Sequence, residues 1–193
     1  MKQFDWKGVM PAITTQFDKN GVLDLNAFRN NLSNQIKAGV HGIILGGTLG
    51  EASTLKDLEK KELLATTLDE VNGKIPVIMN IAEQATSKAV ELAKELEAEG
   101  ADGLMLLPPM RYKANDQETL AYFSSVASST SLPIMIYNNP VDYKIEVTLD
   151  MFEKLKEHKN ISAVKESTRD VTNITRMICL LYTSDAADDP ASV

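Results

Sequence analysis

The sequence predicts an α/β fold in which short buried strands alternate with amphipathic helices around a parallel sheet. Six short runs rich in Val, Ile, Leu and Met are bounded by Gly or Pro, as buried strands are. Their nearly continuous hydrophobicity is typical of parallel strands covered by helices. Two similar segments, AGVHGII and AEGADGLML, each contain the expected end of a helix, a glycine and the start of a strand. This similarity indicates repeated β/α units.

The expected strands lie at residues 8–13, 42–45, 76–81, 103–107, 133–137 and 161–164. The expected helices between them lie at residues 25–38, 55–71, 86–99, 117–129 and 148–158. Six strands with five intervening helices fit a TIM (β/α)8 barrel or a doubly wound sheet. A complete barrel has eight strands and typically about 250 residues. The 193 residues therefore predict an α/β chain that forms an incomplete TIM barrel, with about six β/α units.

Local signals support the helices. Phe28 and Leu32 are four residues apart and share one face of the first helix. Ser53 and Thr54 are candidate N-caps of the second helix, and Thr148 is a candidate N-cap of the fifth.

The composition predicts one catalytic domain at residues 1–178 and a tail at residues 179–193. The chain is 44% hydrophobic, which is enough apolar material for one core. The tail, CLLYTSDAADDPASV, is rich in Ala, Asp and Ser, and this composition is compatible with a disordered tail. We favour the alternative that the tail is not native sequence, because it lacks the strand that should follow residues 168–178.

The charge and the apolar pattern limit the partners. With 27 acidic and 20 basic residues the net charge is -7, which argues against a nucleic-acid partner. A small anionic substrate remains open, because the field inside a pocket can oppose the net charge. No apolar run is long enough to span a bilayer, the first residues lack the apolar stretch of a signal peptide, and the lone Cys179 excludes an internal disulfide framework. We expect a cytoplasmic protein without a membrane partner.

Three residues that can carry chemistry each follow or end a predicted strand. Thr48 follows the second strand in LGGTLGEAST, Tyr137 ends the fifth in IMIYNNP, and Lys165 follows the sixth in SAVKEST. In a β/α barrel the catalytic groups sit at the carboxyl ends of the strands, where the βα loops converge. The three residues are therefore expected to meet at one end of the barrel.

Lys165 is the strongest candidate for catalysis. Ala163 and Val164 precede it, so its stem should emerge from apolar surroundings. Such surroundings favour a neutral amine, which attacks a carbonyl group and holds the substrate as an imine. The alternative is a lysine that pairs with a carboxylate such as Glu166 or extends into solvent. Periodicity alone favours that alternative.

Tyr137 and the turn GGTLGE at residues 46–51 have two interpretations each. Tyr137 is either a proton shuttle or a strand-end aromatic with its hydroxyl hydrogen-bonded. The backbone N–H groups of the turn and the Thr48 hydroxyl can cradle a carboxylate, or the glycines simply permit a tight turn. The turn lacks the GxxxxGK[ST] spacing of a phosphate-binding P-loop.

Taken together, GGTLGE, IYNNP and AVKES resemble the motifs of the dihydrodipicolinate synthase / N-acetylneuraminate lyase family of class I aldolase-like enzymes. The resemblance runs from about residue 6 to residue 178. It implies a TIM barrel, usually tetrameric, with no metal or organic cofactor. It implies Lys165 as the Schiff-base lysine for a 2-oxo acid such as pyruvate, and Tyr137 as the proton donor and acceptor. Thr48, with the backbone of Gly47 and Leu49, would hold the substrate carboxylate and relay protons to Tyr137.

The sequence departs from this family pattern at three places. Leu49 stands where many members have a second hydroxyl residue, so one side-chain contact to the carboxylate is missing. The arginine that dihydrodipicolinate synthases carry after Y-N-x-P aligns with Asp142, and a carboxylate there would repel aspartate semialdehyde. Those enzymes also contribute a tyrosine to the neighbouring subunit, whereas here Arg111 aligns and Tyr112 is one position off. Arg111 is a candidate ligand of a substrate carboxylate, or a surface ion-pair partner.

Three functions follow from these observations. The first is a Schiff-base lyase or aldolase acting on pyruvate or a related 2-oxo acid. The second is a dehydratase, aldolase or deaminase of the same family that acts on a 2-keto-3-deoxy sugar acid. The third is a non-catalytic β/α protein that binds a small anion at the glycine-rich turn.

Overall fold

The computed structural model describes residues 4–110 and 112–186, with side chains as far as Leu180. Its centre is one parallel sheet whose five strands follow one another in space as in the chain. The strands are β1 (Ile43–Leu45), β2 (Val77–Ile81), β3 (Gly103–Leu106), β4 (Ile134–Asn138) and β5 (Ile161–Glu166). A doubly wound sheet reverses its strand order at a switch point, whereas a β/α barrel does not. The predicted fold class, an incomplete β/α barrel, is therefore confirmed.

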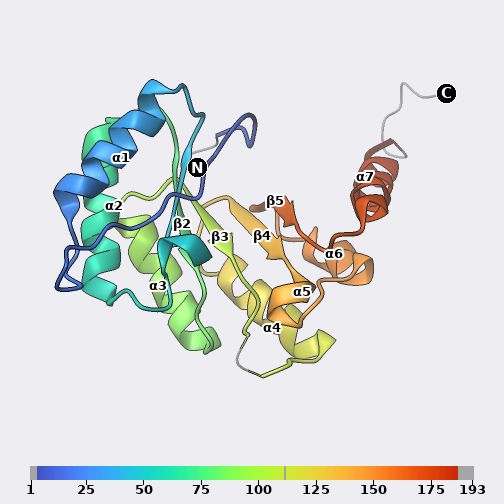
Figure 1. The fold of residues 1–193 in the computed structure, drawn as a ribbon. Helices are drawn as coiled ribbons and strands as arrows, with labels where there is room; N and C mark the ends of the chain where they lie inside the picture. The colour runs from blue at the N-terminus through green and yellow to red at the C-terminus, as the bar shows by residue number, and fades with distance from the viewer. Residues whose placement is uncertain (1–3, 111, 187–193) are drawn as a thin grey trace.

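Helices cover one face of the sheet and leave the other face as the interior of the partial barrel (Figure 1). They are α1 (Leu25–Lys37), α2 (Asp57–Val71), α3 (Thr86–Ala98), α4 (Asp116–Ala127), α5 (Pro140–Tyr143), α6 (Leu149–Leu155) and α7 (Val171–Ala186). The Thr148 hydroxyl accepts the Met151 backbone N–H at 3.4 Å and caps α6, as predicted. The sequence did not predict α5, a single turn directly after β4.

The first predicted strand is not a regular strand. It runs beside β1 through one parallel bridge between Ala12 and Ile44, where the Ile44 backbone N–H donates to the Pro11 carbonyl at 2.9 Å. Two residues explain the interruption. Pro11 has no N–H to donate, and Gly8 has a φ of 91°, which lies outside the extended region. The described residues therefore form five regular strands, whereas the sequence predicted six.

The predicted N-cap of α2 is also wrong. The Thr54 hydroxyl donates to the Glu51 carbonyl at 2.9 Å within a turn, so it does not cap the helix. The helix begins at Asp57, and the Glu59 carboxylate accepts the Lys56 backbone N–H at 2.8 Å. The glycine-rich turn thus extends further along the chain than expected.

Alternate residues along each strand divide between two apolar layers. Val77 and Met79 of β2 pack towards the helices, whereas Ile78 faces the barrel interior with Met105 of β3. Tyr137 of β4 packs against the same inner layer. Because side chains alternate with a period of two, this layer determines which strand residues reach the interior.

Helix α7 packs against α6 at the end of the sheet beyond β5 (Figure 1). It continues past residue 178, where we expected the globular domain to end, as far as Ala186. Residues 187–193 of the predicted tail lie outside the described residues, and the division of the chain at residue 178 stays a prediction. Within the described ranges, no helix is both long and apolar enough to cross a membrane.

Candidate active site

Lys165 and Tyr137 lie side by side at the carboxyl ends of β5 and β4. They are direct partners in the register of this parallel strand pair. The Nζ atom of Lys165 lies 4.1 Å from the centroid of the Tyr137 ring. The structure therefore brings together two predicted site residues, at the end of the strands where barrel enzymes place their catalytic groups.

Glu166 follows Lys165 in the chain, and its carboxylate is held by three other donors. It accepts from Nδ2 of Asn138 and from Nδ2 of Asn173, both at 3.0 Å, and from the Thr168 backbone N–H at 2.7 Å. Strand alternation sends the side chains of Lys165 and Glu166 to opposite faces. In the part of the chain that the structure describes, no ion pair joins Lys165 to a carboxylate. The salt-bridged alternative is thus absent from this structure.

Lys165 lines a cavity of about 340 Å³ inside the partial barrel. The other lining residues are mostly apolar: Trp6, Gly8, Met10, Ala12, Ile44, Met135 and Val164. The indole Nε1 of Trp6 donates to the Ser162 hydroxyl at 2.9 Å and holds the N-terminal segment against β5. Lys165 therefore borders a space, lined mostly by apolar residues, that is large enough for a small ligand.

The glycine-rich turn after β1 is tied to the first extended segment. Thr48, Leu49 and Gly50 form one 3-10 turn, in which the Gly50 N–H donates to the Gly47 carbonyl at 2.9 Å. The Thr15 hydroxyl donates to the Gly50 carbonyl at 2.7 Å. Among the described residues, the backbone N–H groups of Thr48 and Leu49 donate to no protein group. Two such amides beside a hydroxyl can hold a carboxylate.

Tyr143, which the sequence reasoning missed, lies between Thr48 and Tyr137. The hydroxyl oxygens of Tyr143 and Thr48 are 2.7 Å apart. The Tyr143 ring meets the Tyr137 ring edge-on, with centroids 5.4 Å apart and an interplanar angle of 88°. Burial raises the pKa of the Tyr143 phenol, against the lowering effect of its hydrogen bond to Thr48. Thr48, Tyr143, Tyr137 and Lys165 form one row of side chains.

Asn139 and Pro140 begin the short helix that carries Tyr143. The Asn139 side chain accepts the Asp142 backbone N–H at 3.3 Å, and Pro140 takes the first helical position. Nδ2 of Asn139 also donates to the Tyr137 hydroxyl at 3.2 Å and to the Asp142 carboxylate at 2.8 Å. The Asn-Pro pair was the available signal, because it marks a helix start whose first turn ends at Tyr143.

Two further residues of the sequence analysis, Leu49 and Tyr112, have exposed side chains outside this row. Arg111 lies outside the residues that the structure describes, so its predicted substrate contact stays a prediction. The side chain of Tyr112 is 79% exposed and that of Leu49 is 74% exposed. The contact predicted for Leu49 through its backbone N–H stays a prediction.

Asn80 of β2 places a buried carboxamide beside the glycine-rich turn. It lies two residues after Ile78 and therefore faces the barrel interior. Asn80 is 5% exposed, and neither its Oδ1 nor its Nδ2 has a hydrogen-bond partner among the described residues. A Cβ atom built on Gly46 would lie 4.0 Å from that of Asn80. Unpaired buried polar groups are rare enough in folded proteins to call for a functional explanation.

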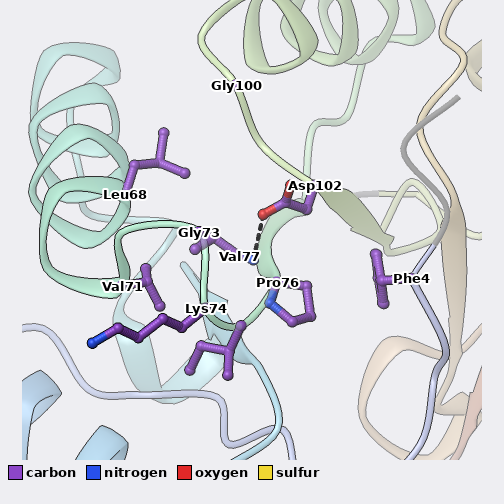
Figure 2. A pocket seen from close by; sticks show the side chains of 10 residues that line it. Phe4, Leu68, Val71, Gly73, Lys74, Pro76, Val77, Gly100 and Asp102 are labelled. Atoms are coloured by element: carbon purple, nitrogen blue, oxygen red, sulfur yellow. Dashed lines mark hydrogen bonds between the residues drawn. The ribbon is translucent and has the colours of Figure 1, made fainter.

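A second cavity, of about 540 Å³, lies at the amino-terminal ends of β2 and β3 (Figure 2). Phe4 and Leu68 line it together with Asp102, whose carboxylate accepts the Val77 backbone N–H at 3.0 Å. Barrel enzymes act at the other, carboxyl ends of their strands. This cavity is therefore separate from the row that contains Lys165.

The described residues form a partial β/α barrel with a row of lysine, tyrosine and threonine side chains at the carboxyl ends of its strands. The chain belongs to the dihydrodipicolinate synthetase family, whose model matches residues 5–185. The resemblance predicted from the three motifs is therefore confirmed.

Named relatives agree with this assignment. The 4-hydroxy-tetrahydrodipicolinate synthase of Methanospirillum hungatei JF-1 is 33% identical over 184 residues, which are 94% of this chain and 63% of that protein. The enzyme of the same name from Bartonella henselae is 37% identical over 163 residues, 84% of this chain and 55% of that protein. The chain thus spans about 60% of the length of these relatives.

Solved structures share the fold. Dihydrodipicolinate synthase from Thermotoga maritima matches with a TM-score of 0.87 and 32% identity, over 92% of this chain and 60% of that one. YagE, a prophage protein of the family from E. coli K12 in complex with pyruvate, matches with a TM-score of 0.87 and 28% identity, over 93% and 61%.

Proposed function

We propose that the row around Lys165 is the active site of a Schiff-base-forming lyase that acts on pyruvate or a related 2-oxo acid. The observation that carries this proposal is the position of Lys165, whose amine lies over the Tyr137 ring and which lines a mostly apolar cavity. A pyruvate complex of a related protein, YagE, supports the class of substrate. Because the chain spans about 60% of its relatives, the proposal concerns the activity of the whole protein.

The first stage is formation of the imine. The Lys165 amine attacks C2 of the 2-oxo acid, and one proton passes from nitrogen to the former carbonyl oxygen. Loss of that oxygen as water leaves a carbon–nitrogen double bond. Tyr137, whose ring centroid lies 4.1 Å from the amine, would carry both protons, first to the oxygen and then to the leaving water.

The second stage uses the protonated imine as an electron sink. When Tyr137 removes a proton from C3, the electron pair moves towards nitrogen and an enamine forms. The enamine carbon attacks an aldehyde in condensation, and the reverse step cleaves the carbon–carbon bond. Loss of a hydroxyl group from the neighbouring carbon, as water, gives dehydration instead. Because the imine accepts the electron pair, we propose that the reaction needs no metal or organic cofactor.

The substrate carboxylate would bind at the glycine-rich turn. The Thr48 hydroxyl and the backbone N–H groups of Thr48 and Leu49 supply its donors. This contact fixes the position of C2 relative to the lysine amine, which is how orientation lowers the barrier of a two-component reaction.

Asp142 favours a second candidate within the same chemistry. Its exposed carboxylate lies one residue before Tyr143, where synthases of the family carry an arginine. A fixed negative charge there disfavours a second substrate that brings its own carboxylate. A 2-keto-3-deoxy sugar acid, with hydroxyl groups in that region, is the alternative substrate for an aldolase, dehydratase or deaminase reaction.

We also propose that the whole protein works as a cytoplasmic homo-oligomer, a tetramer by its resemblance to the family. One solved relative, 31% identical with a TM-score of 0.86, is described as a monomeric dihydrodipicolinate synthase variant. Sedimentation of the whole protein tests this proposal: a tetramer is expected, and a monomer would contradict it.

Borohydride trapping tests the imine. The whole protein is incubated with pyruvate, reduced, digested and mapped by mass spectrometry, beside Lys165→Arg and the control Lys159→Arg, an exposed lysine before β5. We expect one adduct on Lys165 in the wild type and in the control, and none in Lys165→Arg. Pyruvate binding that survives Lys165→Ala with no adduct in the wild type would instead establish a non-catalytic anion-binding protein.

A further inference from the structure

The family resemblance implies that Thr48 relays protons to Tyr137, yet no direct hydrogen bond joins the two residues among the described residues. The family resemblance implies a tyrosine from a neighbouring subunit at this point. Here Arg111 stands at the aligned position, and the next residue, Tyr112, has a side chain that is 79% exposed in the single chain. A tyrosine from that segment would reach this row only from another subunit, so a connection made within one chain needs a different group.

Tyr143 of the same chain fills this position. Its hydroxyl oxygen is 2.7 Å from the Thr48 hydroxyl oxygen, which is a short hydrogen bond. Its ring packs edge-on against the Tyr137 ring at a centroid distance of 5.4 Å. Tyr137 in turn lies under the Lys165 amine at 4.1 Å. One chain thus supplies a continuous sequence of contacts from the glycine-rich turn to the lysine.

We propose that Tyr143 is the proton relay between Thr48 and Tyr137, so that the relay is complete within one subunit and needs no tyrosine from a partner. The proposal rests on the proposed function of the site. Tyr143 acts through Tyr137 and does not itself touch the reacting carbon.

The local fold holds Tyr143 in place for this role. Asn139 and Pro140 begin α5, and Lys144, with a φ of 62°, ends it directly after the tyrosine. Asn138 then ties the chain back to β4, because its side chain binds both the N–H and the carbonyl of Val147. The helix is therefore fixed at both ends, and the phenol has a defined direction.

The chemical environment suits a relay. The Tyr143 phenol is protonated at neutral pH, because burial raises its pKa further above the ordinary value of 10. A protonated phenol accepts a hydrogen bond from one neighbour while it donates to the next. Nδ2 of Asn139 already donates to the Tyr137 oxygen at 3.2 Å, so the Tyr137 proton is directed to another acceptor.

The proton balance is simple. When Tyr137 gives its proton to the substrate, it takes one from Tyr143. Tyr143 takes one from the exposed Thr48 hydroxyl, and Thr48 takes one from solvent. When Tyr137 removes a proton from C3, the same transfers run in reverse. No bond other than O–H bonds is made or broken in the relay, and no oxidant or reductant is required.

Hydrogen exchange into pyruvate tests the relay without knowledge of the second substrate. The whole protein is incubated with pyruvate in D2O, and loss of the methyl proton signal is followed by NMR. For Tyr143→Phe we expect the maximal exchange rate to fall by about 100-fold or more, with KM near the wild-type value. Borohydride should still trap the imine on Lys165, because Lys165 and the ring packing are unchanged.

Two further tyrosines serve as controls. Tyr122→Phe removes a buried hydroxyl that donates to the Glu83 carbonyl at 2.9 Å, away from the row, and should leave exchange unchanged. Tyr112→Phe should also leave exchange unchanged. Slow exchange in Tyr112→Phe together with normal exchange in Tyr143→Phe would overturn the proposal in favour of a tyrosine from a partner.

A double-mutant cycle separates a relay from a structural role. Thr48→Val breaks the same hydrogen bond from the other side, so at saturating pyruvate the double variant with Tyr143→Phe should be no slower than the slower single variant. Additive losses would overturn the relay. Absence of any imine in the wild type would refute the proposed function itself, whereas a normal imine with normal exchange in Tyr143→Phe would refute only the relay.

Discussion

Replacing Asn138 with Ala is expected to lower the free energy of unfolding by about 4 kcal/mol. Asn138 is fully buried at the end of β4. Its Oδ1 accepts the Val147 N–H at 3.0 Å, and its Nδ2 donates to the Val147 carbonyl at 3.2 Å and to the Glu166 carboxylate at 3.0 Å. One side chain therefore connects β4, β5 and the segment that follows α5.

The magnitude follows from what the truncation leaves behind. Val147 is 1% exposed, so its N–H and its carbonyl would both remain buried without a partner, at about 1–3 kcal/mol each. The hydrogen bond to the charged Glu166 adds about 1.5–3 kcal/mol, reduced because Asn173 and Thr168 still donate to that carboxylate. The lower ends of the three ranges add up to about 3.5 kcal/mol, so a loss of about 4 kcal/mol is expected.

Urea unfolding followed by circular dichroism measures the effect, with the exposed Asn20→Ala as the matched control. The control should lie within about 0.5 kcal/mol of the wild type. A loss below about 1 kcal/mol for Asn138→Ala would refute the reasoning, because such a value is ordinary for one exposed hydrogen bond. Asn138→Asp keeps an acceptor for the Val147 N–H but sets a carboxylate against Glu166, and it should cost at least as much.

Three other predictions concern the turn, the inner face and the outer surface. Gly50→Ala places a Cβ 2.9 Å from the Ile13 carbonyl oxygen, so we expect a loss of about 1–3 kcal/mol and weaker pyruvate binding by calorimetry; unchanged affinity would contradict the role of the turn. Asn80→Val removes an unpaired buried amide and should raise the unfolding free energy by about 1 kcal/mol; a decrease in the urea midpoint would show that the amide has a partner. Hydrogen bonds from Ser131 and its neighbour lower the pKa of Glu97 below its ordinary value of 4.5. Its contribution to stability is therefore complete above pH 4.5 and lost as the pH falls through the lowered pKa, so Glu97→Gln should flatten the acid limb of the melting-temperature profile. Identical acid limbs in the two proteins would disprove this.

The sequence predicted the positions of the candidate residues that the strands carry. Lys165 and Tyr137 were placed correctly because each lies at the end of an apolar run, and the period of two puts them on one face when the strands pair in parallel. The register that makes them direct neighbours depends on long-range pairing, which no local pattern encodes. Glu166 shows the same limit, because its three donors come together only in the folded chain.

Tyr143 was missed because it belongs to a helix of only four residues. A single turn has no hydrophobic period to detect, and its only local signals are the capping Asn139 and the proline that follows. The first predicted strand failed for a related reason. Its apolar pattern was right, but Pro11 lacks a donor and Gly8 turns the chain, so backbone geometry overrode hydrophobicity.

A crystal structure of the whole protein grown with pyruvate tests the central claim most directly. The account predicts continuous electron density between Nζ of Lys165 and C2 of the ligand, with the ligand carboxylate against the Thr48 hydroxyl and the Leu49 N–H. Pyruvate bound without a covalent link, or linked to another lysine while Lys165 stays unmodified, would contradict it.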